Sequence, residues 1–241
     1  MKYAILSDVH GNLEALRAVL DDAAGRADAV LCLGDAVGYG ADPAACIELL
    51  ATRARGFVAG NHEYGVADRL DLGWFNRWAR AAAEWTRERL DDDHRAWLAA
   101  LPLTLEIGDA TLVHASPAQP DEWDYLVTAE DGWGAFAHFA TRWCFVGHSH
   151  VPGVWSLGSS GPEHEPAPGH VVSERGRRYI VNVGSVGQPR DRDPRAAYGL
   201  WDVEAGRVEI RRVAYDVATA RRKIEAAGLP RFLADRLVVG A

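Results

Sequence analysis

Three short apolar runs alternate with two helical patterns over the first sixty residues, which is typical of strands and helices in turn. The runs cover 3–7, 29–33 and 57–59. The first helix is expected from about Leu13, with Leu16 and Leu20 on one face and Asn12 as a suitable N-cap. The second covers 43–53 and has a proline in its first turn. This βαβαβ order predicts a parallel sheet with crossover helices.

A second set of strands is expected in the rest of the chain. A Gly-Asp pair divides residues 103–113 into the two arms of a hairpin. Further strands are expected over 143–146, 179–183, 197–203 and 207–213, and helices over about 129–141 and from 216 onward, interrupted near 228–230. Without internal repeats or a boundary in composition, residues 1–241 are interpreted as a single domain.

Two segments differ from this alternation. A Trp-rich helical segment over about 64–101 carries Trp74, Trp78, Ala81 and Trp85 in one apolar stripe. This spacing predicts a core face, a lid or a subunit interface, and the last of these would make the protein a homodimer. Residues 156–170 are rich in Gly, Pro, Ser and Glu, which predicts a mobile loop or the tip of a long hairpin.

The net charge of −8 argues against a nucleic-acid or membrane-surface partner bound through basic patches. The first apolar run is too short for a signal peptide or a membrane span, and no other run approaches the roughly 20 apolar residues that a span needs. A cytoplasmic location is therefore expected. Cys32, Cys46 and Cys144 lie far apart without zinc-finger spacing, so they are expected to be buried free thiols.

Side chains of the kinds that bind metals follow five of the expected strands directly. They are Asp8 and His10, then Asp35, then Asn61 and His62, then His114, and finally His148 and His150. Because the carboxyl ends of parallel strands lie along one edge of a sheet, these residues are expected to converge. Two carboxylates and five imidazoles buried together would be costly without a cation. The other four histidines (94, 138, 164 and 170) have no such context and are interpreted as surface or hydrogen-bonded residues.

The chemistry of these ligands indicates which metals would bind. Carboxylate, amide oxygen and imidazole without thiolate suit Mn²⁺, iron or Zn²⁺ and argue against a structural cysteine-type zinc site. Seven ligands are too many for one ion but fit two ions if one carboxylate bridges them. Two ions about 3.5–4 Å apart form a recurring site for phosphate ester hydrolysis.

Taken together, these motifs resemble the signature of the calcineurin-like metallophosphoesterases. The motifs are Asp8-x-His10, Gly34-Asp35, Gly60-Asn61-His62-Glu63, His114 and Gly147-His148-x-His150. The size of the chain, its "SDVHGN" opening and its "NVGSVGQPR" segment are similar to the bacterial single-domain phosphodiesterases of that superfamily. The resemblance implies a four-layer α/β/β/α sandwich of two mixed sheets flanked by helices.

The resemblance also implies how the residues divide between two divalent ions. One ion would take Asp8, His10 and His150, the other would take Asn61, His114 and His148, and Asp35 would bridge them. A metal-bridging hydroxide would attack phosphorus directly. His62 would protonate the leaving oxygen or stabilise the transition state, a contribution of about 10²–10⁴-fold; the alternative is a structural histidine behind the ligands.

The chain departs from the protein phosphatases at three positions. Gly38 and Tyr39 replace the acid and the arginine that follow the Gly-Asp motif in those enzymes, and Ala59 replaces the arginine before "GNHE". Two phosphate-binding cations are therefore missing, which favours a monoanionic phosphodiester over a dianionic monoester. Arg190 and Arg192 are candidates to replace them, with solvated loop arginines as the equal alternative.

The substrate interpretation keeps several alternatives open. Asn12 is a candidate donor to a phosphate oxygen, although its N-cap role explains it equally well. The leading function is a phosphodiesterase acting on a small phosphate ester such as a nucleotide. A phosphomonoesterase or a dinucleoside polyphosphate hydrolase is the alternative within the same class. A non-catalytic protein-binding scaffold of the same fold is the alternative from another class, and it is disfavoured because no ligand position is lost.

Overall fold

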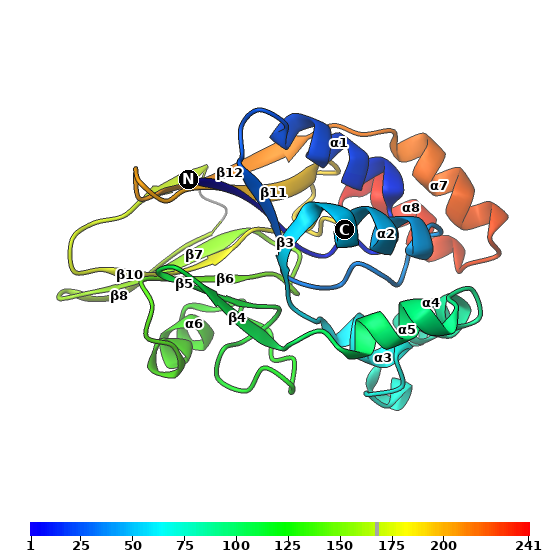
Figure 1. Cartoon of the computed structure of the whole chain (residues 1–241), viewed down its shortest axis with the longest axis horizontal. Coiled ribbons are helices and arrows are strands. Elements are labelled where there is room, and N and C mark those ends of the chain that lie inside the picture. Colours follow the sequence, from blue (N-terminus) through cyan, green and yellow to red (C-terminus); the bar gives the residue numbers. More distant parts are fainter. Residues whose placement is uncertain (167–168) are drawn as a thin grey trace.

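Two mixed β-sheets of six strands each form the centre of the computed structural model, which describes residues 1–166 and 169–241 (Figure 1). The first sheet has the order β3 (Ala54–Phe57), β2 (Ala29–Cys32), β1 (Lys2–Leu6), β11 (Ala196–Asp202), β12 (Arg207–Val213) and β9 (His170–Val172). The second has the order β4 (Thr104–Ile107), β5 (Ala110–Val113), β6 (Trp143–Val146), β10 (Arg178–Asn182), β7 (Gly153–Gly158) and β8 (Gly161–Pro166).

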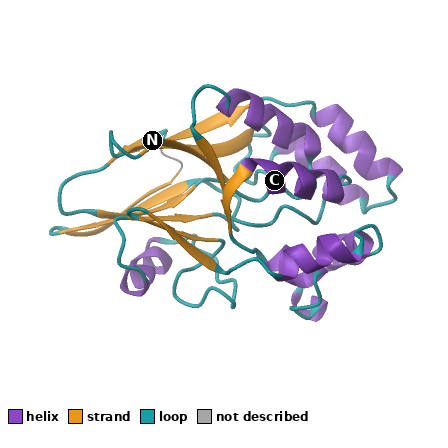
Figure 2. Cartoon of the chain, in the orientation of Figure 1, coloured by secondary structure: helices purple, strands orange, loops and turns teal. Residues whose placement is uncertain are grey.

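Helices lie on the outside of the strands (Figure 2). They are α1 (Leu13–Ala23), α2 (Pro43–Arg53), α3 (Asn61–Val66), η1 (Leu72–Trp74), α4 (Arg77–Arg87), α5 (Asp92–Ala99), α6 (Ala129–Ala135), η2 (Phe136–His138), α7 (Val217–Ala226) and α8 (Arg231–Val239). Helices α1 and α2 share a buried cluster with the outer face of the first sheet, and α6 shares one with the outer face of the second.

Successive side chains of the central strands point alternately to the two faces of each sheet, and this explains the four layers. In β1, Ile5 points into the cluster between the two sheets, whereas Leu6 belongs to the cluster beneath α1 and α2. In β6, Phe145 faces the other sheet and Val146 faces α6. Since both faces of these strands are buried, their sequences are continuous apolar runs. The expected α/β/β/α sandwich is confirmed.

Parallel pairing brings several strand ends to the same edge of the sandwich. β1, β2 and β3 are mutually parallel in the first sheet, and β5, β6 and β10 are parallel in the second. The residues that follow these six strands therefore meet between the sheets, although the strands are spread over most of the chain.

The structure corrects two expectations about individual elements and decides a third. Strand β3 covers Ala54–Phe57 rather than 57–59, because β2 pairs with Ala54 and then, across a bulge, with Gly56. Over 156–166 the structure has the paired strands β7 and β8, which confirms the hairpin alternative and not a loop; residues 167–168 lie outside the described residues. The expected helix over 129–141 is shorter, ending after α6 and η2 at His138.

The Trp stripe is not one helical face. Trp74 belongs to η1, is 83% exposed and precedes the Asn76 N-cap of α4. Trp78 instead stacks on Phe232 of α8, and the Trp85 indole donates to the Ala227 carbonyl, 3.0 Å away. Within this chain the second half of the stripe therefore attaches α4 to the C-terminal helices.

Other features agree with expectation. All three cysteines are buried free thiols. The C-terminal region forms two helices separated near Gly228, as the sequence indicates. In the part of the chain that the structure describes, no helix combines the length and the apolar character needed to cross a bilayer.

Candidate metal centre

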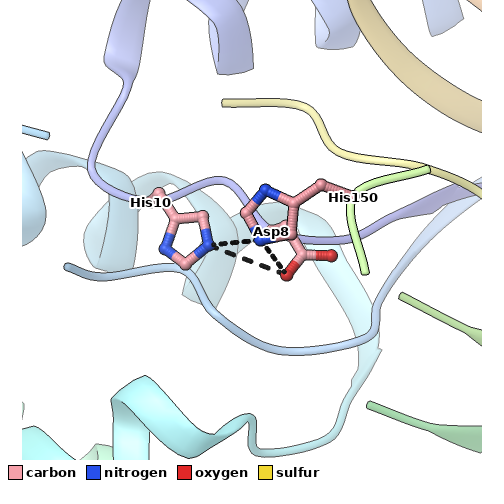
Figure 3. A group of neighbouring side chains, drawn as sticks. All are labelled: Asp8, His10 and His150. Atoms are coloured by element: carbon pink, nitrogen blue, oxygen red, sulfur yellow. Dashed lines mark hydrogen bonds and ion pairs between the residues drawn. The ribbon is translucent and has the colours of Figure 1, made fainter. Parts of the chain in front are cut away.

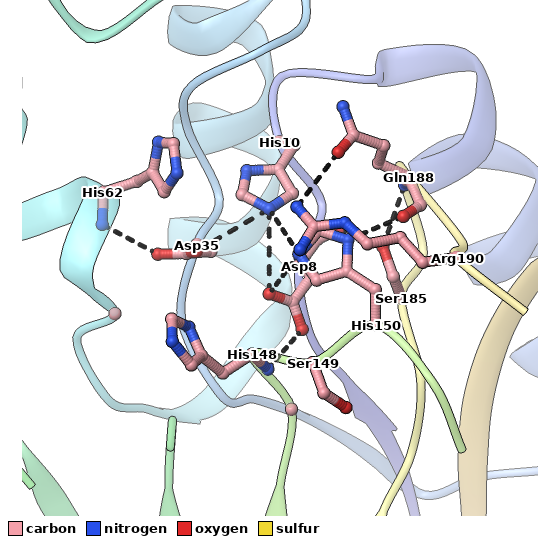
Figure 4. A network of polar contacts seen from close by, with 12 residues as sticks. Asp8, His10, Asp35, His62, His148, Ser149, His150, Ser185, Gln188 and Arg190 are labelled. Atoms are coloured by element: carbon pink, nitrogen blue, oxygen red, sulfur yellow. Dashed lines mark hydrogen bonds and ion pairs between the residues drawn. The ribbon is translucent and has the colours of Figure 1, made fainter. Parts of the chain in front are cut away.

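The residues that follow five strands form one buried cluster at the shared edge of the two sheets (Figure 4). Asp8 and His10 follow β1, Asp35 follows β2, and His148 and His150 follow β6. His114 follows β5 directly, and Asn61 begins α3 after β3. The sequence-predicted residues are thus brought together from segments up to about 140 positions apart.

An unusual backbone conformation recurs among these residues. Asp8, His10, Asp35, His148 and His150 all have positive φ values, between 52° and 63°. Non-glycine residues rarely adopt this left-handed conformation, and each instance costs on the order of 1–3 kcal/mol. The "GHSH" segment is therefore a turn rather than an extended strand, and it directs its two histidines to different partners.

Asp8, His10 and His150 form a first group (Figure 3). Their candidate ligand atoms all lie within 4.8 Å of one another. The Nε2 atom of His150 is 3.2 Å from Asp8 Oδ1 and 3.1 Å from His10 Nε2. The other Asp8 oxygen, Oδ2, accepts the backbone N–H of His148 at 3.0 Å. Gly147 allows this contact, because a Cβ there would lie 2.5 Å from Asp8 Oδ2.

Asp35, His114 and His148 form a second group of the same kind. His114 Nε2 is 3.3 Å from Asp35 Oδ2 and 3.1 Å from His148 Nδ1. Asp35 Oδ2 is also 3.6 Å from His10 Nε2. One carboxylate oxygen thus lies between the two groups, which is the position that a bridging ligand requires.

Backbone carbonyls determine which imidazole nitrogens remain available. The Nδ1 atoms of His10, His114 and His150 lie 2.9, 2.7 and 2.6 Å from the carbonyls of Val37, Leu33 and Gln188. Because a carbonyl can only accept, each Nδ1 must carry the hydrogen, which leaves Nε2 as the lone pair of the neutral ring. When both rings are neutral, the facing Nε2 atoms of His10 and His150 present two lone pairs to each other, an arrangement that a cation satisfies.

Charges within the cluster also favour a cation. Burial opposes ionisation of Asp8 and Asp35, yet the surrounding histidines hold both carboxyl pKa values well below their usual range. Burial lowers the pKa of His148 and of His150 to about 3, so both rings are neutral at pH 7. Burial acts in the same direction on His114, but Asp35 and Asp8 raise its pKa to about 10. A proton on His114 thus compensates charge that a metal ion would neutralise.

Two buried oxygen atoms of the cluster have no hydrogen-bond partner among the described residues. They are Asp8 Oδ1 and Asn61 Oδ1. Buried polar atoms are rarely left unpaired, and both are of types that bind Mn²⁺, iron or Zn²⁺. The residues present therefore fit a pair of divalent ions.

His62 lies beside the cluster on the first turn of α3. Its backbone N–H donates to Asp35 Oδ1 at 2.9 Å, and its Nδ1 is buried without a partner in the described structure. Burial lowers the pKa of His62 to about 3. A Cβ on Gly38 would lie 2.1 Å from His62 Nδ1. An acidic side chain at position 38 would therefore contact the His62 ring, and Gly38 does not provide this contact.

Glu63 has a structural role that the sequence interpretation did not assign. Its carboxylate is fully buried and accepts the backbone N–H groups of Asp35, Ala36 and Gly60 at 2.6–2.7 Å. Burial, together with the nearby charge of Asp35, raises its pKa to about 7. Glu63 therefore holds the loop after β2 against the start of α3. Its position directly after Asn61 and His62 in the sequence is the signal from which this role could have been inferred.

The "NVGSVGQPR" segment after β10 holds the other loops of the site. Asn182 Nδ2 donates to the Gly147 carbonyl at 2.6 Å, and Ser185 Oγ donates to the Asp8 carbonyl at 2.8 Å. These bonds connect the end of β10 to the loops after β6 and β1. The segment thus fixes ligand-bearing loops from both sheets.

The predicted substrate contacts differ in their surroundings. Asn12 is buried, with Oδ1 accepting the Ala15 N–H and Nδ2 donating to the Gly187 carbonyl, so the N-cap interpretation is confirmed. Arg190 is half-buried beside His150 (Figure 4). Arg192 is exposed, and its backbone N–H donates to Gly240. Only Arg190 is thereby placed at the cluster.

Comparison with known proteins agrees with this geometry. Residues 1–206 match the family model of the calcineurin-like phosphoesterase superfamily domain. The chain belongs to this family, which uses a dinuclear metal centre and includes phosphoester hydrolases as well as some non-catalytic members.

Three relatives cover nearly the whole chain. A metallophosphoesterase from Sphaerobacter thermophilus is 42% identical, with a TM-score of 0.87 over 100% of this chain and 99% of its own. An uncharacterized protein from Methanocaldococcus jannaschii is 38% identical over 98% of this chain and 97% of its own length. A hypothetical protein from Pyrococcus horikoshii shares the fold, with a TM-score of 0.81 at 21% identity over 100% of this chain and 98% of its own.

Proposed function

We propose that the protein is a dinuclear metal-dependent phosphodiesterase. The observation that supports this most strongly is the pair of imidazole lone pairs of His10 and His150, which face each other 3.1 Å apart beside the unpartnered Asp8 Oδ1. A second contact between imidazoles joins His114 Nε2 to His148 Nδ1 at 3.1 Å. Two such contacts with Asp35 between them suit two cations better than one.

In this proposal Asp8, His10 and His150 hold one ion, Asn61, His114 and His148 hold the other, and Asp35 contacts both. Divalent Mn, Fe or Zn ions, when bound, supply a deprotonated water nucleophile at neutral pH and offset negative charge on the phosphate oxygens. The carbonyl-anchored imidazoles keep the ligand nitrogens oriented before any ion arrives.

His62 would contact the leaving oxygen of the substrate. Its unpartnered Nδ1 and the surrounding Tyr39 and Phe75 rings place a neutral imidazole at the edge of the cluster. Since no acid stands at Gly38 to hold a proton on this ring, a strongly basic leaving group would be protonated poorly. That favours a substrate with an ester leaving group of moderate basicity.

A monoanionic diester is favoured over a dianionic monoester because two positions that carry phosphate-binding cations in the protein phosphatases carry none in this chain. The positions that carry phosphate-binding arginines in the protein phosphatases are Tyr39 and Ala59 here, and both residues are buried apolar neighbours of the site. A phosphodiester carries one negative charge fewer than the dianion of a phosphomonoester, so less positive charge is needed to neutralise it.

Hydrolysis of bis(p-nitrophenyl) phosphate, p-nitrophenyl phosphate and a small nucleotide panel, each with Mn²⁺, Fe²⁺ and Zn²⁺, tests the function. We expect metal-dependent turnover that is faster for the diester. Protein that binds no divalent metal, or that cleaves no ester with metal supplied, would rule out the enzyme and leave the scaffold alternative.

Replacement of His62 separates its substrate role from a ligand role. His62→Ala should lower turnover about 10²–10⁴-fold while metal content, measured by elemental analysis, stays unchanged. His94→Ala, at a half-buried histidine paired with Asp91 away from the cluster, is the control and should change neither quantity. Loss of metal in parallel with activity would instead assign His62 to an ion, as its position within 4.8 Å of His10 and Asp35 also permits.

A further inference from the structure

His148 is anchored differently from the other three imidazoles of the candidate metal centre. His10, His114 and His150 each have Nδ1 against a backbone carbonyl. In His148 it is Nδ1 that faces the cluster, 3.1 Å from His114 Nε2. No carbonyl or carboxylate of the described residues accepts a hydrogen bond from its other ring nitrogen, Nε2. The orientation of this one ring is therefore not fixed by a hydrogen bond to the backbone.

The ring of Tyr125 lies against the His148 imidazole instead. The two ring centres are 4.1 Å apart and the ring planes differ by 24°, which is a stacked arrangement. Tyr125 is 52% exposed and His148 only 7%, so the tyrosine is the outer of the two rings. A histidine ring has broad energy wells for rotation about its Cβ–Cγ bond, and an aromatic ring stacked on one of its faces restricts that rotation.

The loop that carries Tyr125 connects β5 to α6 and is held on both sides of this residue. On one side, Trp123 has a left-handed backbone with φ 60°, which a bulky residue keeps only where its surroundings hold it. On the other side, Leu126 is buried in the cluster beneath α6. The Thr128 carbonyl also accepts the indole N–H of Trp155 at 2.7 Å. Tyr125 is thus presented to His148 by an ordered segment.

The aromatic side chains of this loop contact both histidines of the second group. Trp123 packs edge-on against His114, with ring centres 6.1 Å apart and planes at 65°. His114 in turn meets His148 edge-on, with ring centres 4.9 Å apart. The four rings therefore pack in the order Trp123, His114, His148 and Tyr125. The loop after β5 acts in this way on the half of the centre that contains Asp35.

We propose that Tyr125 is a positioning residue of the candidate metal centre, whose ring holds the His148 imidazole in the orientation in which Nδ1 faces His114. Groups behind a ligand that fix its orientation raise the affinity of a site for its metal. At His148 a stacked ring takes the place that a backbone carbonyl has behind the other imidazoles. The consequence for metal binding rests on the proposed function, in which Asn61, His114 and His148 hold one ion.

Titration of the metal-free protein with Zn²⁺ tests this inference. Tyr125→Leu keeps an apolar side chain but removes the planar ring. It should weaken the ion that His148→Ala also weakens, by about two- to tenfold, the contribution of one aromatic pair. Tyr125→Phe keeps the ring and should retain the wild-type affinity. Val127→Ala, at an exposed residue of the same loop, is the control and should affect neither ion. Unchanged binding in Tyr125→Leu, or equal weakening of both ions, would overturn the inference.

Nuclear magnetic resonance of the metal-free protein with labelled histidines gives a readout that needs neither metal nor turnover. The Tyr125 ring current should move the His148 ring protons upfield, and these protons should show a nuclear Overhauser contact with those of His114. Tyr125→Leu should lose the shift and weaken the contact, whereas Tyr125→Phe should retain both; His148→Ala assigns the signals, and thermal unfolding checks that each variant is folded.

The two measurements separate this inference from the proposed function. If the wild-type protein binds no divalent ion, the proposed function fails, and the resonance comparison still decides whether Tyr125 positions His148. A contact between the His148 and His114 rings that is unchanged in Tyr125→Leu would overturn the inference.

Discussion

His114 and His150 belong to opposite halves of the same cluster and differ in the charges around them. Both rings are almost fully buried, at 0% and 2% exposure, and both Nδ1 atoms donate to a carbonyl. Yet the pKa of His114 is raised to about 10, whereas that of His150 is lowered to about 3. Burial lowers both; Asp35 then dominates around His114, while Arg190 adds to the effect of burial at His150.

This difference teaches that the two halves of the centre are not equivalent. The half that contains Asp35 and His114 is the more negative, because Asp8 and Glu63 also act on His114. The half that contains Asp8 and His150 has a guanidinium beside it. We therefore expect the first ion to bind at the Asp35 half more tightly than the second ion binds at the Asp8 half.

Removing the Asp35 carboxylate should abolish the difference between the two halves, since this carboxylate acts on both. Asp35→Asn keeps the shape of the side chain but removes its charge, and we expect both ions to be lost. Turnover should fall about 10⁴-fold, taking about 10² for each of two lost electrostatic contributions. Elemental analysis and single-substrate kinetics measure this. Retention of one tightly bound ion would show that Asp35 does not contact both.

Replacing one histidine at a time should separate the halves. His150→Ala should weaken the ion beside Asp8 and His10, and His148→Ala should weaken the ion beside Asp35 and His114, each by at least about 10–100-fold in affinity. Metal titrations of the two variants should therefore lose different binding phases, the weaker phase in His150→Ala and the tighter in His148→Ala. Loss of the same phase in both variants would contradict the division into two groups.

A different expected effect, which needs no metal, is the pH dependence of stability in the metal-free protein. The pKa values of His148 and His150 are near 3 in the folded state and about 6.5 when unfolded, so the unfolded chain takes up more protons below pH 6.5. Stability should fall with acid from pH 6.5 toward 3, by about 1.4 kcal/mol per pH unit for each proton.

His114 should give the opposite dependence. Its raised pKa contributes stability that is present below pH 6.5 and is lost as the pH rises toward 10. Urea unfolding at several pH values should show a maximum near pH 6.5. His114→Gln should remove the decline above pH 7, where the raised pKa of Glu63 no longer contributes. A free energy of unfolding that does not change between pH 5 and 7 would contradict the predicted loss of stability in acid.

Much of the fold followed from local patterns. The runs around Ile5 and Phe145 are apolar because both faces of their strands are buried, and this is visible in the sequence. Strand β3 was misplaced because its residues, Ala54–Phe57, include an arginine and a glycine and are defined by their pairing with β2. The prediction of one Trp-bearing helical face was wrong for a similar reason. The helix is interrupted at Phe75 and Asn76, and the spacing of the tryptophans in the sequence does not reveal that interruption.

The sequence by itself determined the types of ligand, their order and their position after strands, because each is a local property of residues next to an apolar run. Only the tertiary structure decided which ligand faces which. The carbonyls behind His10, His114 and His150 and the charges beside these rings come from segments distant in the chain.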